Sequence, residues 1–288
     1  MNSVLPLPEH LPWNDHAAYV LFDGTTLEHL PQQLRSLDPA VTATALFDVP
    51  PFAALRDISP LLVPIEQPDG PIFQFFMRQA HEESMLLLFS PQPLHDLARH
   101  LRKLLTVELP EGQTILLRLA DAAVARALFD SGDQRLFGPL SWVVTADGLS
   151  ADWCCQRPRG ADCPDLPTPY RLSPEQNEAL DRVDRRRALL DLDSHLRTHF
   201  PDFLGHLTST ERWPRLEQLA EHANALGLAS QSEWLYFANI MAWLDGAPLD
   251  QHPDIARLLK TPSLQSPGER VALAAERAHR WATERGQP

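Results

Sequence analysis

Short apolar runs that each stop at an aspartate recur through the first half of this 288-residue chain. Three of them end on the same triplet, in Leu21-Phe22-Asp23, Leu46-Phe47-Asp48 and Leu128-Phe129-Asp130, and a fourth runs from Ile115 to Ala120 before Asp121. Apolar runs of this length that are closed by a polar residue are typical of strands buried in a sheet. The first, second and fourth runs are therefore predicted to be buried strands of an α/β sheet.

A single charge interrupts the fourth run. Side chains alternate between the two faces of a strand, so Arg118 is expected to lie among apolar neighbours. A buried guanidinium needs an ionic partner, and the nearest candidates in the sequence are the strand-end carboxylates Asp23, Asp48 and Asp121. Such a cluster is either an active site or a structural brace. The brace is favoured, because neither a glycine-rich loop nor a second basic residue accompanies Arg118.

Strand-like and helix-like segments alternate up to about residue 155, and a proline-rich stretch then leads into helical segments only. The expected strands cover residues 18–22, 41–47, 61–65, 85–89, 106–109, 114–119, 140–145 and 149–154. The expected helices cover residues 25–36, 72–82, 93–104, 122–129, 173–199, 213–226, a segment from Ser230, 253–260 and 267–283. This order predicts an α/β (α+β) lobe with a mixed sheet and flanking helices over residues 1–155, a linker over 156–172 and an all-helical lobe over 173–288.

Composition excludes several classes of protein. The formal net charge of −13 argues against nucleic-acid binding, which needs basic contacts to phosphate. Only 12 glycines are present, and neither common glycine-rich nucleotide loop occurs. No apolar run reaches the length of about 18 residues that a membrane span requires, and the start does not resemble a secretory signal. A cytoplasmic protein is expected, and the odd count of three cysteines fits that compartment.

One helical segment carries a possible metal-binding pattern. Asp191, His195 and His199 are spaced four residues apart, which places them on one side of a helix. Two imidazoles and a carboxylate suit zinc or iron, but the same spacing also describes a solvated polar stripe. The polar stripe is the favoured interpretation, and neither a metal nor a cofactor is predicted.

Several local strings resemble a known family. They are the strand Tyr19 to Asp23 followed by Gly24, the segment 59–63, the strand that ends at Ser90, the string 117–121 and the string 137–139 before Trp142. Together these strings, over about residues 16–145, resemble the adaptor-chaperone domain of bacterial type VI secretion systems (the Tap or Tec proteins), long known only as a domain of unknown function. Where the family usually has a proline and a basic residue after its Arg-x-x-Asp string, this chain has Ala122-Ala123.

The resemblance implies structural roles for the residues that carry it. These are Asp23, Gly24, Arg118, Asp121, Gly138 and Pro139. It also implies a non-enzymatic protein that binds a toxic effector, often by the N-terminal region of the effector, and helps load it onto the VgrG spike or its PAAR tip. The sequence leaves two alternatives open. One is a small α/β enzyme that acts on an anionic substrate through Arg118 and the strand-end aspartates, and the other is an immunity protein that masks a toxin.

Overall fold

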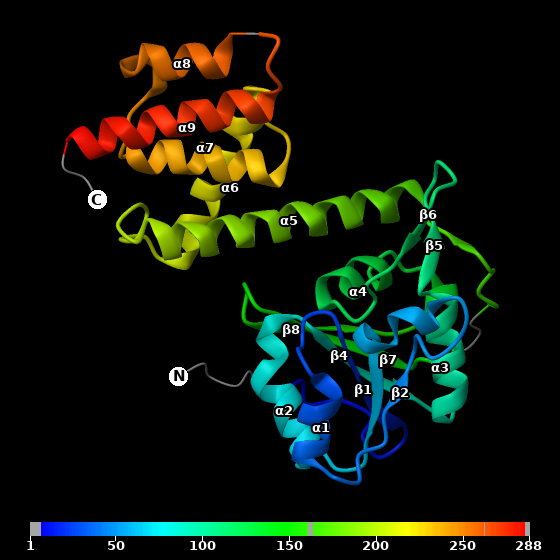
Figure 1. Cartoon of the computed structure of the whole chain (residues 1–288). Coiled ribbons are helices and arrows are strands. Elements are labelled where there is room, and N and C mark those ends of the chain that lie inside the picture. Colours follow the sequence, from blue (N-terminus) through cyan, green and yellow to red (C-terminus); the bar gives the residue numbers. More distant parts are fainter. Residues whose placement is uncertain (1–6, 161–163, 262, 286–288) are drawn as a thin grey trace. The chain divides into compact units, whose positions relative to one another are not determined.

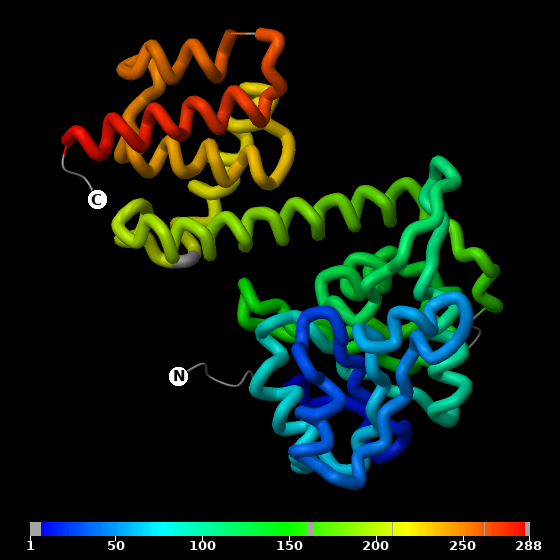
Figure 2. Tube along the Cα trace, in the orientation of Figure 1, coloured from blue at the N-terminus to red at the C-terminus, as the bar shows by residue number. Residues whose placement is uncertain are grey.

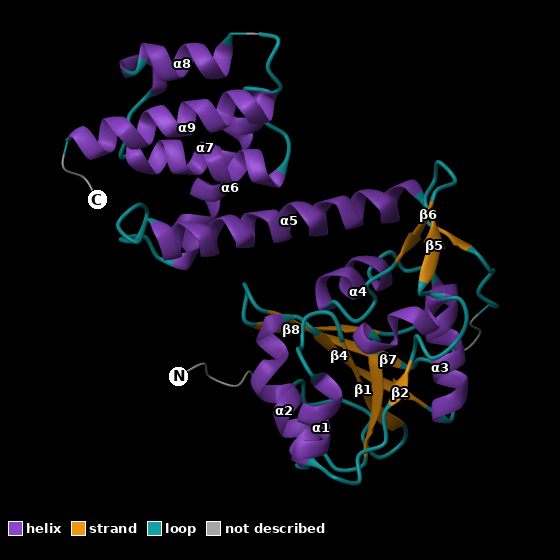
Figure 3. Cartoon of the chain, in the orientation of Figure 1, coloured by secondary structure: helices purple, strands orange, loops and turns teal. Residues whose placement is uncertain are grey.

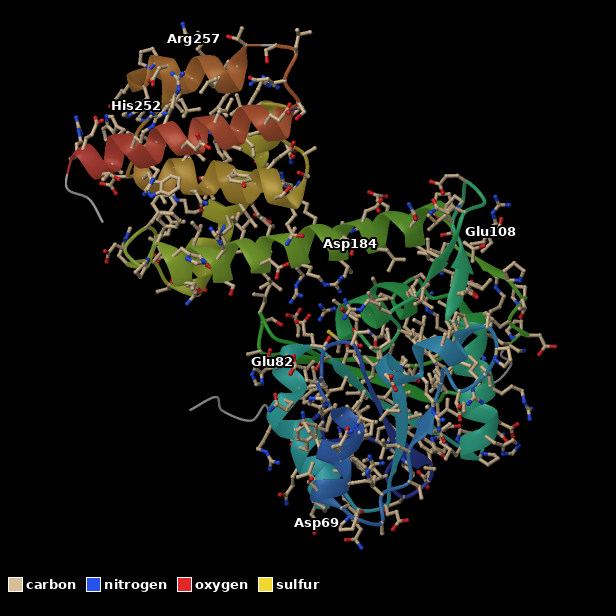
Figure 4. The ribbon with its side chains drawn as sticks, viewed as in Figure 1. Asp69, Glu82, Glu108, Asp184, His252 and Arg257 are labelled. Carbon is tan, nitrogen blue, oxygen red and sulfur yellow. The ribbon has the colours of Figure 1, made fainter. Side chains whose placement is uncertain are left out.

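The computed structural model describes residues 7–160, 164–261 and 263–285 (Figure 1). The chain forms two compact units, Met1–Val183 and Asp184–Pro288. The division falls inside helix α5 (Pro174–His199), and Asp184 is labelled on that helix in Figure 4. Figure 2 follows the course of the chain through each unit.

The first unit is built on a six-stranded sheet with the strand order β2-β3-β1-β4-β7-β8 (Figure 3). The strands are β1 (Ala17–Phe22), β2 (Thr44–Ala45), β3 (Leu61–Ile65), β4 (Met85–Ser90), β7 (Trp142–Asp147) and β8 (Asp152–Gln156). Neighbouring strands in this sheet are antiparallel throughout. Strand β1 therefore lies between β3 and β4 near the middle of the sheet, and β8 forms one edge.

Helices cover both faces of this sheet, which explains why its central strands are continuous apolar runs. In β1, Val20 and Phe22 belong to the core that includes residues of α1 (Leu30–Leu37) and α2 (Pro71–Gln79). Tyr19 and Leu21 point to the other face and pack with residues of α3 (Leu94–Lys103) and α4 (Ala122–Phe129). Antiparallel sheets often alternate apolar and polar residues because one face meets water. Here neither face does, so both sets of alternating positions are apolar.

A small second sheet joins the start of α5 to the first unit. Its strands β5 (Thr106–Glu108), β6 (Thr114–Leu116) and β9 (Tyr170–Arg171) have the order β6-β5-β9, and β5 and β9 are parallel. The hydroxyl of the buried Tyr170 donates to Asp133 Oδ2 at 2.8 Å and accepts from Gln176 Nε2 at 2.7 Å. Burial raises the pKa of Tyr170 to about 12. Because Gln176 lies in the first turn of α5, this network fixes the start of the helix.

The second unit contains helices only among its described residues (Figure 3). They are the latter part of α5, α6 (Ser209–Ala225), α7 (Gln231–Trp243), α8 (Pro253–Lys260) and α9 (Pro267–Glu284), with the short 3-10 helix Leu249–Gln251. Helices α6, α7 and α9 each begin with a capping box, in which a Thr or Ser and a Glu three residues later satisfy each other's backbone N–H groups. Apolar residues from α5 to α9 form one core.

The predicted fold class is confirmed: an α/β region with a central sheet is followed by a helical region. The parallel pair expected of a mixed sheet lies in the small sheet rather than in the large one. The expected linker over 156–172 contains β9, and the domain bounds expected from the sequence stay a prediction.

Several element bounds differ from the prediction, and the structure shows the reason for three of them. Strand β6 ends at Leu116: the N–H of Leu117 makes a last bond in register with β5, to the carbonyl of Leu105, and the chain then turns between Arg118 and Asp121. The strand expected over residues 41–47 is reduced to β2, which pairs only with the first two residues of β3. Helix α1 begins at Leu30 rather than at Thr25, because Pro31 is favourable only in the first turn of a helix.

Candidate functional site

A buried carboxylate follows directly after β1. The N–H of Asp23 donates to the carbonyl of Ser84 at 2.9 Å, which continues the pairing of β1 with β4 by one residue. Its Oδ1 accepts from the N–H and the hydroxyl of Thr25 at 2.7 and 2.6 Å, and its Oδ2 accepts from Arg118 Nη2 at 2.7 Å and from Thr26 Oγ1 at 3.3 Å. We call the group formed by Asp23, Thr25, Thr26 and Arg118 the Asp23 corner.

The environment of Asp23 favours its ionised form. Burial alone would raise the pKa of this carboxyl group, since its side chain is only 4% exposed. The hydrogen bonds from Thr25 and from Arg118, together with the positive charge of Arg118, outweigh burial and hold the pKa of Asp23 below its ordinary value. The carboxylate is thus a charged acceptor surrounded by donors on both oxygens.

Arg118 is not the buried strand residue that its sequence context predicts. It follows the end of β6, and its side chain is 41% exposed. From that position Nη2 reaches Asp23 and also lies 3.1 Å from Thr25 Oγ1 and 3.2 Å from Thr26 Oγ1. The prediction that a strand-end aspartate receives Arg118 is confirmed for Asp23.

Asp121 caps a helix and does not share the role of Asp23. Its Oδ1 accepts from the N–H groups of Ala123 and Val124 at 3.0 and 3.1 Å, so it is the N-cap of α4. The N–H of Asp121 donates to the carbonyl of Arg118 at 3.0 Å, which closes a turn between the two residues. The next N–H, that of Ala122, donates to the carbonyl of Glu83 at 2.8 Å. Segment 83–84 therefore holds both Asp23 and the start of α4 next to the beginning of β4.

Asp48 lies outside this group. It is half-exposed and pairs with Arg56 at 3.6 Å on the surface. Of the three carboxylates considered as partners of Arg118, the structure pairs Asp23 with it, whereas Asp121 caps a helix and Asp48 forms a separate surface pair.

Gly24 is required by close packing beside the Asp23 corner. A Cβ atom at this position would collide with the backbone carbonyl of Ser59. Ser59 is itself fixed, because its hydroxyl accepts from the N–H of Phe47 at 2.9 Å and donates to the carbonyl of Pro60 at 2.9 Å. Backbone cannot move aside as a flexible side chain can, so the position excludes any side chain.

Gly138 and Pro139 belong to a second corner, at the opposite end of β4. Gly138 has φ +49°, and a Cβ there would collide with the imidazole ring of His100. That ring is buried and donates from Nε2 to the carbonyl of Leu136 at 2.7 Å, and burial lowers the pKa of His100. The carbonyl of Pro139 accepts from Ser90 Oγ at 2.8 Å. The six family-motif residues thus form two groups rather than one site.

The Asp23 corner has the properties of a brace. Its one buried charge is satisfied by Arg118 and by two threonines, so the group joins the end of β1 to the loop that precedes α4. None of the six family-motif residues lines the cavities of about 280, 200 and 170 Å³ in this chain. The sequence-based interpretation missed Thr25 and Thr26. The signal was present, since a Thr two residues after an Asp is typical of turns in which the carboxylate bonds the following backbone.

The possible metal ligands on α5 are occupied by neighbouring amides. His195 Nε2 lies 2.7 Å from Asn239 Oδ1, and Asp191 Oδ2 accepts from Gln231 Nε2 at 2.7 Å. The rings of His195 and His199 are 4.6 Å apart between centroids. Across the described ranges, no group of three His, Cys, Asp or Glu side chains is arranged to hold a metal ion.

Two further observations concern the surface of the chain. Cys154 is half-buried and Cys155 is exposed, both as free thiols, whereas Cys163 lies outside the described residues. Within the part of the chain that the structure describes, no helix is both long enough and apolar enough to cross a membrane.

Comparison with known proteins places the first unit in a family. Residues 18–136, from β1 to the 3-10 helix Gln134–Leu136, match the model of DUF4123, described as a domain of unknown function. Over its length the chain is also similar to accessory protein VasW of Vibrio cholerae serotype O1, with 27% identity over 286 residues that cover 96% of this chain and 93% of VasW. No solved structure matches the chain. The family resemblance inferred from the sequence is confirmed.

Proposed function

We propose that this chain is a non-enzymatic accessory protein of a bacterial type VI secretion system. In the cytoplasm of the producing cell it binds a cognate toxic effector and helps load it onto the VgrG spike or its PAAR tip. The observation that carries the proposal is the similarity to accessory protein VasW, because it extends over 96% of this chain and therefore includes both compact units.

The Asp23 corner supports a scaffold role for Asp23 and Arg118, two of the residues that carry the family resemblance. Arg118 already donates to Asp23, and the carboxylate is covered by Thr25 and Thr26. An enzyme that used this arginine to bind an anionic substrate would have to share one guanidinium between the substrate and a buried carboxylate, and so weaken the bonding of that carboxylate. Recognition of a partner by the outer surface of the folded unit requires no such loss.

Secretion of the effector provides the test. The effector gene beside the gene for this chain is expressed in a strain that lacks the chain, and both the effector and VgrG are measured in the culture supernatant. We expect the effector to be lost from the supernatant and restored by the complementing gene, while VgrG secretion continues. An effector that is secreted equally in both strains would contradict the proposal.

Binding and toxicity measurements separate the alternatives. For an adaptor, the purified chain binds the loading region of the effector, and expression of the chain in target cells does not protect them. An immunity protein would instead bind the toxic domain and protect the target cells. An enzyme would lose a measured turnover in a folded Arg118→Ala variant.

A further inference from the structure

A small cavity lies at the end of β8, away from both corners described above. Its volume is about 200 Å³. We call it the β8 cavity, and the residues of its lining that matter here are Phe129, Asp130, Gly132, Gln156, Arg157 and Arg159. A space of this size accepts one side chain of a partner rather than a separate cofactor.

One residue that lines the β8 cavity carries a buried, unsatisfied acceptor. Gln156 is 8% exposed, and its Nε2 donates to Asp130 Oδ1 at 3.0 Å. This bond fixes the orientation of the amide and leaves Oε1 as the other polar atom, which is buried and has no hydrogen-bond partner among the described residues. A buried acceptor without a donor costs about 1 to 3 kcal/mol. A ligand with an N–H group at this point would remove that cost.

Two arginines against one carboxylate, Asp130, give the lining of the β8 cavity a net positive charge. The guanidinium of Arg157 lies 5.6 Å from the centroid of the Trp142 ring. The guanidinium of Arg159 lies against Gly132: a Cβ atom added to Gly132 would be 3.2 Å from Arg159 Nη2. The backbone N–H of Arg159 donates to Gln134 Oε1 at 2.7 Å. No carboxylate of the described residues forms an ion pair with either arginine. In a chain with a net charge of −13, these two side chains are suited to an acidic group from a partner.

The open edge of the large sheet leads into the β8 cavity. The N–H of Trp153 donates to Asp152 Oδ1 at 2.8 Å instead of to β7. Because backbone groups alternate in direction along a strand, the N–H and carbonyl of Cys155 point to the same open edge. At the other side of the sheet, the edge strand β2 has only two residues, and the part of β3 beyond its pairing with β2 contains Pro64, which has no N–H to offer. Strand β8 is therefore the edge that can accept a further strand.

We infer that an extended segment of the partner adds to the edge of β8 and places an Asp or Glu side chain in the β8 cavity. The carboxylate pairs with Arg157 and Arg159, and an N–H of the segment donates to Gln156 Oε1. This inference rests on the proposed function, since the segment belongs to the effector. Main-chain bonds supply affinity, and the charge pairing sets the register of the added strand.

Charge reversal tests the inference. The full chain carrying Arg157→Glu and Arg159→Glu is titrated with the effector encoded beside its gene. The matched control carries Arg35→Glu and Arg78→Glu, two exposed arginines in the last turns of α1 and α2 in the same unit. We expect the cavity variant to bind about tenfold more weakly or worse, and the control to stay within about twofold of the unmodified chain. Equal affinities for the cavity variant and the unmodified chain would overturn the inference.

Further measurements guard against misfolding and separate the two proposals. If the charge-reversed variant unfolds at a lower temperature than the unmodified chain, the double variant Arg157→Gln and Arg159→Gln is used instead, because it removes the positive charges without adding negative ones. The affinity of that variant for the effector then tests the inference. An Asp or Glu of the effector changed to Arg is expected to restore binding to the reversed variant. Hydrogen exchange of residues 152–157 is expected to slow in the complex, and unchanged exchange there would rule out strand addition. If the unmodified chain does not bind the effector, the proposed function itself fails.

Discussion

Arg118 Nη2 lies 2.7 Å from Asp23 Oδ2, although 95 positions separate the two residues in the sequence. The carboxylate is almost completely buried, whereas the guanidinium is half in solvent. The acid therefore depends on the bond more than the base does, because only the acid has exchanged its water for protein donors.

Loss of Arg118 is expected to destabilise the fold. Arg118→Ala leaves Asp23 buried with only the threonines as donors, and we expect the free energy of unfolding to fall by about 1 to 3 kcal/mol, less than for a fully buried pair because solvent screens the exposed arginine. The matched control is Arg56→Ala, which breaks the surface pair with Asp48 and should cost less than about 0.5 kcal/mol. Urea unfolding measures both, and equal effects would contradict the brace.

The acid sensitivity of the chain should depend on Asp23. Its pKa is lowered in the folded state, so the stabilisation is fully present above the ordinary pKa of Asp, near 4, and is lost as the pH falls through the folded value. Asp23→Asn removes the stabilisation at neutral pH together with its acid-dependent loss. We expect the unfolding free energies of the unmodified chain and of the Asp23→Asn variant to differ at pH 7 and to converge below about pH 4. His100 contributes equally to both curves, so parallel curves would show that Asp23 is not the titrating group.

A side chain at position 138 should disturb the buried His100. Gly138→Ala adds both a strained φ and a collision with the imidazole, and we expect a loss of about 2 to 4 kcal/mol in the free energy of unfolding. Gly112→Ala is the control, because Gly112 has φ +93° but its Cβ would meet nothing closer than 3.7 Å. The loss of stability in that control, about 1 to 2 kcal/mol, measures the cost of placing a non-glycine residue at positive φ without a collision. If both variants lose the same stability, the packing against His100 is unimportant.

The start of α5 should loosen when Tyr170 loses its hydroxyl. Tyr170→Phe leaves Asp133 and Gln176 without their shared partner, and we expect the free energy of unfolding to fall by about 1 to 2 kcal/mol. Hydrogen exchange should speed up in residues 174–180. Tyr236→Phe, at a residue that is 44% exposed, should leave both measurements unchanged. Equal exchange at the start of α5 in all three proteins would contradict this role of the network.

Zinc should not stabilise the second unit. His195 and Asp191 are already bonded to Asn239 and Gln231, so a metal ion would have to displace these amides. We expect one equivalent of zinc to leave the melting temperature unchanged, both in the unmodified chain and in a His195→Ala control. A melting temperature that rises with zinc concentration in the unmodified chain alone would show a metal site.

Sequence patterns predicted those elements whose limits are set locally. Strand β3 covers the predicted residues 61–65, an apolar run that begins directly after Pro60, and α4 covers the predicted residues 122–129 because Asp121 caps it. Strand β6 ended earlier than its pattern indicated, because the chain turns at residues 118–121, where Arg118 bonds Asp23 and the N–H of Ala122 bonds Glu83, and such contacts leave no mark in the alternation of side chains. Local pattern and tertiary bonding compete at that point, and tertiary bonding determines the bound.

The candidate site was predictable only in part for the same reason. The sequence marked Arg118 as a charge in need of a partner and offered three aspartates. The choice of Asp23 depends on segment 83–84, which bonds both Asp23 and the start of α4 and is remote from Arg118 in the sequence. The β8 cavity left no sequence signal, because a glutamine and two arginines in a proline-rich stretch match many exposed loops.

The burial of both sheet faces limits where partner specificity can change. Substitutions in β1 or β4 alter the core on one side or the other, so these strands are constrained by folding alone. Residues 157–160 carry no comparable constraint from the core, and in the edge strand β8 that constraint is concentrated in Trp153, which packs against Phe76, and in the buried Gln156. If the proposed function holds, a graft of residues 152–160 that keeps Trp153 and Gln156, taken from a relative with another effector, should transfer partner choice while leaving the melting temperature of the recipient nearly unchanged, which would make this edge the exchangeable part of the first unit.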